Sequence, residues 1–300
     1  MSFPNFIIAG FPKCGTTSLH HYLSEHPQIY MPKQKELHFF THKILSKQLG
    51  GKGDKITKQM HVNSLDNYKN FFPDSNKYKA IGEASPSYIN YPEVYNKIKT
   101  QLSSPKIIVL VRDPINRAYS NYLHLKRESR ELLSFQDALD NEQTRKKLKY
   151  SDFWYYKFNS LYYEKIKHLK NVFDNVLLLT QEELMSSPEL TIKKTYLFLN
   201  VENSFVPKII NKKYNPGGNY TNNIITRAIF KPSKTKNILK KIISIKPWMK
   251  DGLNWITRQY KNPTEPIEKE TLAKLKNYFR KDVELIESIG VDVSSWRNYK

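Results

Sequence analysis

The chain has 300 residues, is 39% hydrophobic and contains one cysteine, so it can bury the core of one domain but excludes an internal disulfide framework. Its formal net charge of +21 favours anionic partners, yet 40 of the 49 basic residues are lysines, a bias that codon usage alone can produce. No zinc-finger spacing, RNP motif or basic heptad array indicates sequence-specific nucleic-acid binding, and the eight histidines show no metal-ligand spacing.

The hydropathy pattern predicts no transmembrane segment, because no apolar run approaches the length that a bilayer requires. The first predicted strand begins almost at Met1, which leaves no room for a signal peptide or an anchor. We therefore expect one cytoplasmic domain covering residues 1–300.

The first motif is a glycine-bounded loop between a predicted strand and a predicted helix. Residues 6–9 (FIIA) are typical of a buried parallel strand, and apolar residues recur at helical spacing from Thr17. Between them lies the loop GFPKCG, residues 10–15. This order directs backbone N–H groups and the positive end of a helix dipole to one point, which predicts an anion site. A tight turn that needs glycine only for its backbone angles is the alternative.

The loop differs from the nucleotide-binding pattern GxxxxGK[ST] in the position of its lysine. Lys13 precedes the second glycine by two positions, and Thr16 follows that glycine where the pattern has lysine. The second clear strand, residues 106–111, ends in Arg112, where a magnesium-dependent NTPase needs an acidic residue. Arginine repels a divalent cation and attracts phosphate, so we expect a ligand with two separated anionic groups and no metal.

Residues 12–17 (PKCGTT) and 112–120 (RDPINRAYS), about 100 residues apart, resemble the phosphosulfate loop and the 3′-phosphate motif of sulfotransferases that use 3′-phosphoadenosine 5′-phosphosulfate (PAPS). Residues 35–40 (KELHFF) and 82–88 (GEASPSY) are similar to those of heparan-type carbohydrate sulfotransferases and their bacterial relatives. The resemblance fades between about residues 200 and 265.

The resemblance implies roles for the residues of the first loop. Lys13 would contact the bridging oxygen and the transferring sulfuryl group. The 5′-phosphate contacts would come from Gly15, Thr16, Thr17 and Ser18. Cys14 belongs to the same donor-binding loop, and we interpret it as a small filler because no activating partner is evident.

The second motif predicts a 3′-phosphate site at a strand–helix junction. Asp113 is a plausible N-cap and Pro114 a natural first helical residue, so Arg112 would lie at the carboxyl end of a strand. Ser120, about two turns into the helix, could reach the same phosphate. An ordinary junction with a surface arginine is the alternative.

Glu36 and His38 are the candidates for proton transfer. Two residues apart on an extended segment, they would face one side while Leu37 faces the other. By resemblance, Glu36 is the general base and His38 orients it or the acceptor. The alternative is a solvated glutamate beside a structural histidine. Glu83 would hold acceptor hydroxyls or support Lys13, with a slight preference for a role in the site.

The remaining pattern alternates strands and helices, which predicts a three-layer α/β/α fold with a central parallel sheet. We expect one strand at residues 176–179 and helical segments at residues 92–102, 159–173, 182–185, 188–199 and 269–289. Proline and glycine interrupt residues 202–266, which we interpret as a lid or an acceptor-contacting insertion. The resemblance places Gly218 and Tyr220 on the adenosine, with a surface loop as the alternative. Residues 238–245 could form a basic amphipathic helix for an acidic glycan or a membrane surface, although we favour the alternative of a solvated packing helix.

Together these features predict a PAPS-dependent O-sulfotransferase that releases 3′-phosphoadenosine 5′-phosphate (PAP), needs no metal and acts on a carbohydrate hydroxyl, with acidic polysaccharides among the expected acceptors. A P-loop kinase or NTPase is the second hypothesis. The third is a non-enzymatic basic protein that binds glycans or nucleic acid.

Overall fold

The structure is a computed structural model that describes residues 3–72, 77–210, 218–221, 223–233, 235, 252, 255–257 and 259–299. Within these ranges, five strands form a sheet in the order β2-β3-β1-β4-β5. Every neighbouring pair in this sheet is parallel. The strands are β1 (Phe6–Gly10), β2 (Ile29–Tyr30), β3 (Ala80–Ala84), β4 (Lys106–Val111) and β5 (Val176–Thr180).

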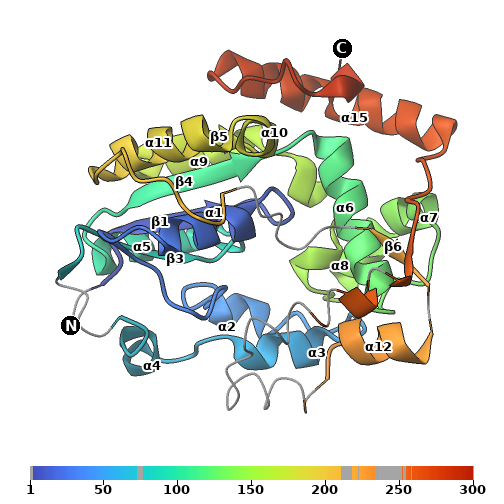
Figure 1. Cartoon of the computed structure of the whole chain (residues 1–300). Helices are drawn as coiled ribbons and strands as arrows, with labels where there is room; N and C mark the ends of the chain where they lie inside the picture. Colours follow the sequence, from blue (N-terminus) through green and yellow to red (C-terminus); the bar gives the residue numbers. More distant parts are fainter. Residues whose placement is uncertain are drawn as a thin grey trace.

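Helices cover both faces of the sheet, so the predicted three-layer α/β/α fold is confirmed (Figure 1). On one face α1 (Thr16–Ser24) contacts α11 (Pro188–Leu199), and on the other α5 (Tyr95–Gln101) contacts α9 (Tyr163–Val172). Right-handed crossovers explain this division, because the chain moves from β1 toward one edge and from β3 toward the other. The long helix α15 (Lys269–Ser288) packs on α9.

Further helices connect and flank these layers. The helix α6 (Pro114–Arg127) leaves β4 and extends down to α12 (Ile224–Phe230), which it contacts (Figure 1). The other described α-helices are α2 (His42–Leu45), α3 (Asp54–Thr57), α4 (Leu65–Lys69), α7 (Phe135–Asp140), α8 (Glu142–Lys147) and α10 (Gln181–Ser186). None of the helices in the described part of the chain combines the length and the apolarity needed to cross a membrane.

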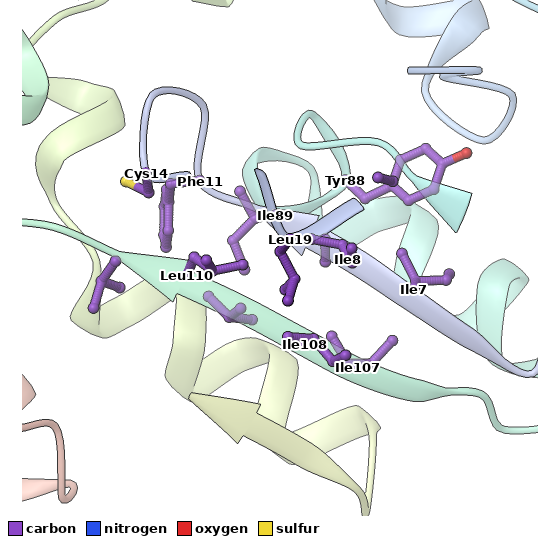
Figure 2. Packing of buried hydrophobic residues seen from close by; sticks show 14 of the residues in the cluster. Ile7, Ile8, Phe11, Cys14, Leu19, Tyr88, Ile89, Ile107, Ile108 and Leu110 are labelled. Atoms are coloured by element: carbon purple, nitrogen blue, oxygen red, sulfur yellow. The ribbon is translucent and has the colours of Figure 1, made fainter. Parts of the chain in front are cut away.

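The core lies where β1 and β4 meet the helices. Figure 2 shows Ile7 and Ile8 of β1, Ile107 and Ile108 of β4 and Leu19 of α1 in one apolar cluster. All five side chains are almost completely buried. This burial on both faces explains why the two strands read as continuous apolar runs.

Most predicted elements are present, with shifted ends. The segment 92–102 begins as a 3-10 helix, Pro92–Val94, before α5, and the predicted helix 159–173 starts at Tyr163. The strands β2 and β3 were not predicted. Within the segment 202–266, β6 (Asn219–Tyr220) pairs antiparallel with β7 (Lys261–Asn262). The predicted basic helix at residues 238–245 lies outside the described residues.

Candidate active site

The loop between β1 and α1 is shaped to receive an anion. Gly15 is the N-cap of α1 and adopts a left-handed φ of 93°, a conformation that glycine tolerates. The first N–H groups of a helix have no carbonyl partner within it, so those of Thr16, Thr17 and Ser18 suit an oxyanion. We call residues 10–18 the phosphate loop.

A cavity of about 590 Å³, here the donor cavity, lies beside this loop. It brings together eight sequence-predicted residues: Lys13, Gly15, Thr16, Thr17, Ser18, Arg112, Ser120 and Gly218. Glu36 also lines it, as do side chains that sequence reasoning did not select, among them Lys35, His124 and Arg127. The two motifs that lie far apart in the sequence therefore share one cavity.

Two predicted donor-binding residues are placed elsewhere. Cys14 is completely buried behind the loop, its N–H donates to Phe11 O, and burial raises the pKa of its thiol to about 12. This agrees with the role of an inert filler. Tyr220 packs its ring against Phe230 with centroids 4.9 Å apart, and the Arg127 guanidinium lies 6.0 Å from the centre of the Tyr220 ring. Tyr220 therefore contacts Arg127, which lines the donor cavity.

The two arginines of the second motif serve different purposes. Arg112 follows β4, lines the donor cavity and places Nη1 3.5 Å from Lys13 O. Arg117 is completely buried and donates to Ser160 Oγ, Tyr156 O, Asn121 Oδ1 and Pro12 O. Arg117 thus fastens the phosphate loop to α6, while Arg112 remains in the donor cavity.

Asp113 begins α6 as the sequence predicted. Its carboxylate accepts hydrogen bonds from the N–H groups of Ile115 and Asn116, and Pro114 is the first helical residue. This cap holds the start of α6 immediately after β4, which puts Arg112 at the carboxyl end of its strand.

Positive charge is concentrated around Lys13. Burial, followed by the charges of Arg127 and Arg112, lowers the pKa of Lys13 to about 8. Repulsion among these three cations destabilises their charged forms when no anion is bound. A bound anion would stabilise them.

His124 supports Lys13 and was not selected from the sequence. Its Nδ1 lies 3.4 Å from Lys13 Nζ and 3.0 Å from Arg127 Nη2, and its Nε2 lies 3.2 Å from Glu128 Oε1. Because Lys and Arg only donate and a carboxylate only accepts, we assign the proton to Nε2 and the lone pair to Nδ1. Burial and the Lys13 charge lower the pKa of His124 to about 4, in agreement with a neutral ring.

Lys35 joins the phosphate loop to the predicted base. Its Nζ donates to Thr16 Oγ1 at 3.1 Å, to Thr17 Oγ1 at 3.2 Å and to Glu36 Oε1 at 2.9 Å. Although partial burial would raise the pKa of Glu36, the charge of Lys35 and the contact with His38 lower it well below its ordinary value. Glu36 is therefore ionised at neutral pH.

The backbone at Glu36 and His38 differs from the predicted extended segment. Both residues have left-handed φ values, 62° and 51°, and the Glu36 N–H donates to Ala84 O. The prediction of an extended segment was wrong, yet the two side chains do meet, with His38 Nε2 3.9 Å from Glu36 Oε2. A 2.7 Å contact between His38 Nδ1 and Ser87 Oγ fixes the ring.

Glu83 does not reach the cavities. It is completely buried on β3 and accepts hydrogen bonds from Tyr68 Oη at 3.0 Å and Ser85 Oγ at 3.1 Å, and burial raises its pKa. Ser85 Oγ also accepts the His38 N–H at 3.0 Å. The preferred prediction of a direct site role for Glu83 was wrong, because its buried carboxylate bonds to Tyr68 and Ser85 and lines neither cavity.

A second cavity of about 260 Å³, here the acceptor-side cavity, adjoins the first. The two cavities share five lining residues: Pro12, Glu36, Pro86, His124 and Phe153. Glu36 thus stands where the contents of both can meet, with 51% of its side chain exposed. In the described ranges no group of three or more His, Cys, Asp or Glu side chains could hold a metal ion.

Comparison with known proteins agrees with this geometry. Residues 4–205 match the model of the sulfotransferase family, and the chain belongs to that family. A crystal structure of a sulfotransferase from Alicyclobacillus acidocaldarius is 29% identical, with a TM-score of 0.77, and the match covers 99% of this chain and 100% of that one.

Curated relatives match a shorter region. The membrane-associated sulfotransferase kil1 of Dictyostelium discoideum is 35% identical over 122 residues, which are 40% of this chain and 22% of that protein. The mouse heparan sulfate glucosamine 3-O-sulfotransferase 5 is 30% identical over 119 residues, again 40% of this chain and 30% of the relative. The match therefore spans less than a third of these relatives.

The different roles of the two arginines lead to a stability prediction. Arg117→Met should lower the free energy of unfolding by about 3 kcal/mol, because it removes a buried donor and leaves its acceptors unsatisfied. Arg112→Met should change it by less than about 1 kcal/mol, since among the described residues its side chain makes one long hydrogen bond, to Lys13 O at 3.5 Å. Urea unfolding followed by circular dichroism measures both, and equal losses for the two variants would contradict the assignment.

Proposed function

We propose that the protein transfers a sulfuryl group from PAPS to a hydroxyl of a carbohydrate acceptor and releases PAP. The observation that supports this most strongly is the position of Glu36, an ionised carboxylate at the wall shared by a cationic cavity and a second cavity. A donor bound in the first and an acceptor in the second would meet at this carboxylate.

The donor cavity fits a nucleotide with two separated phosphates. Its volume of about 590 Å³ lies in the usual range for ligand sites. The phosphate loop would hold the 5′ end through Thr16, Thr17 and Ser18, while Arg112 and Ser120 would hold the 3′-phosphate. Arg112 stands where an NTPase places an acidic magnesium ligand, which disfavours the kinase or NTPase alternative.

The chain's own residues account for an in-line transfer. Glu36 accepts the proton of the acceptor hydroxyl while that oxygen forms a bond to sulfur and the bond from sulfur to the phosphate oxygen of PAP breaks. Lys13 stabilises the negative charge that develops on the departing oxygen. Neutral His124 accepts a hydrogen bond from Lys13 and positions it, and His38 orients Glu36.

The lid would complete the donor site. Gly218 lines the donor cavity, and Tyr220 with Phe230 of α12 packs around Arg127, whose guanidinium lies 4.9 Å from the centre of the Phe230 ring. These contacts support a role for this region in covering the adenosine.

The single buried cysteine supports a reducing, cytoplasmic location for the enzyme.

Glu36→Gln tests the proposed base. The amide cannot accept the proton, so transfer to any active acceptor should fall by about 10²–10⁴. The PAP dissociation constant should stay within about threefold, because Lys13 and Arg112 are unchanged. Labelled PAPS and calorimetry give the two readouts, and Glu93→Gln, at an exposed position, is the control. Retained transfer would remove Glu36 from this role.

The depressed pKa of Lys13 predicts a pH effect on PAP binding. The ammonium form attracts the donor and is lost as the pH rises through about 8, so the affinity for PAP should fall about tenfold per pH unit above that value. Lys13→Met should bind PAP weakly at all pH values and lack this fall. Calorimetry between pH 6.5 and 9.5 measures the effect, and an identical slope in Lys13→Met would contradict it.

A further inference from the structure

The charges around the acceptor-side cavity differ from those of the donor cavity. The donor cavity is lined by four cations, Lys13, Lys35, Arg112 and Arg127, and by the carboxylate of Glu36. The acceptor-side cavity is lined by three carboxylates and two cations: Glu36, Glu128, Asp152, Lys58 and Arg130. Its lining therefore provides no excess of positive charge.

Both of those cations are already engaged by the protein. Arg130 pairs with Glu128 at 3.1 Å and with Asp54 at 2.6 Å, and its Nε donates to Lys52 O. The arginine side chain is only 5% exposed. Lys58 Nζ donates to the carbonyl groups of Leu45 and Gln48, and burial lowers its pKa to about 8.

The two carboxylates other than Glu36 are held by neutral or internal partners. Asp152 Oδ2 accepts from Asn90 Nδ2 at 2.8 Å. Although burial would raise the pKa of Glu128, its contacts with His124 and Arg130 lower it to about 2. Burial raises the pKa of Asp152.

Three histidines also line the cavity: burial lowers the pKa of His61 to about 2 and that of His124 to about 4, so both rings are neutral, and His38 contacts Ser87 Oγ and Glu36. A uronate or sulfate group placed here would thus meet carboxylates and, among the described lining residues, no lysine or arginine without a protein partner, an arrangement that disfavours an anion.

The remaining lining residues offer apolar surface and hydrogen-bonding groups, which suit one sugar ring. Pro12, Pro86, Leu45 and Phe153 provide apolar surface, while the carboxylate of Asp152 can accept hydrogen bonds and the hydroxyl of Ser87 can donate or accept them. The volume of about 260 Å³ is below the usual range for drug-sized ligands, which favours a single sugar unit over a chain.

We propose that the acceptor unit bound beside Glu36 is an uncharged sugar ring, and that the enzyme discriminates against acidic glycans through the paired charges of this cavity. This inference rests on the proposed function. It differs from the acidic polysaccharide that the net charge of +21 favoured, because, of these two cavities, the donor cavity has an excess of cations and the acceptor-side cavity does not.

Initial rates with labelled PAPS test the proposal. The panel contains neutral methyl hexosides, the corresponding uronates and the corresponding amino sugars, which share their other ring hydroxyls within each set. The kcat/KM for the best neutral hexoside should exceed that of its uronate by at least about tenfold. Preference for a uronate or an amino sugar, or for a simple phenol, overturns the proposal.

A charge variant separates electrostatic selection from shape. Asp152→Asn keeps the size and an oxygen acceptor but removes the negative charge, so the ratio of neutral to acidic kcat/KM should fall about threefold or more. Asp174→Asn, at an 80% exposed side chain, should leave the ratio unchanged. An unchanged ratio in Asp152→Asn contradicts the mechanism.

PAP calorimetry distinguishes failure of this inference from failure of the proposed function. If PAP binds and a charged sugar is sulfated in preference to its neutral counterpart, the inference alone is wrong. If PAP does not bind, or no sugar of the panel is sulfated, the proposed function is wrong as well.

Discussion

The site depends on the pairing of β1 with β4. These neighbouring parallel strands end at the same edge of the sheet, so the loop after β1 and the junction after β4 meet although about 100 residues separate them. The Phe11 N–H donates to Leu110 O at 2.8 Å just beyond the strand, and Arg117 reaches back to Pro12 O. This pairing assembles the cationic cavity, because neither segment alone can surround a ligand with two phosphates.

Repulsion among the assembled cations explains several surrounding features. Lys13, Arg112 and Arg127 lie close enough to lower the pKa of Lys13, and the structure offsets this repulsion with neutral acceptors such as His124 Nδ1. Lys35 is balanced by Glu36, so the base is coupled to the phosphate loop through one ammonium group. A bound anion would relieve the remaining repulsion, which links donor binding to the arrangement of the catalytic residues.

The sequence predicted the parts of this site that local patterns specify. Strands buried on both faces and glycine, proline and aspartate at the junctions identified β1, β4, the phosphate loop and Arg112. The hydropathy pattern does not predict the strand β3, because its residues AIGEA include a glycine and a charged residue, both buried. Gly82 is required there because an added Cβ would lie 2.1 Å from the Phe6 ring. Such a contact between strands leaves no local signal.

The sequence spacing along α6 identifies His124 and Arg127 as site residues. With Asn116 and Ser120 they recur every three or four residues along α6, and all four line the donor cavity. One face of this helix therefore forms a wall of the site. The left-handed backbone at Glu36 and His38 could not be predicted, since the partners of their N–H groups, Ala84 O and Ser85 Oγ, lie at the end of a strand distant in the sequence.

The central claim is that the two motifs hold one ligand by its two phosphates, and a binding cycle tests it most directly. Calorimetry would compare PAP with adenosine 5′-phosphate, which lacks the 3′-phosphate, on the wild-type protein and on Arg112→Ala. The account predicts that Arg112→Ala weakens PAP binding by about tenfold or more and leaves adenosine 5′-phosphate binding nearly unchanged. Equal losses for both ligands, or no PAP binding by the wild-type protein, would contradict it.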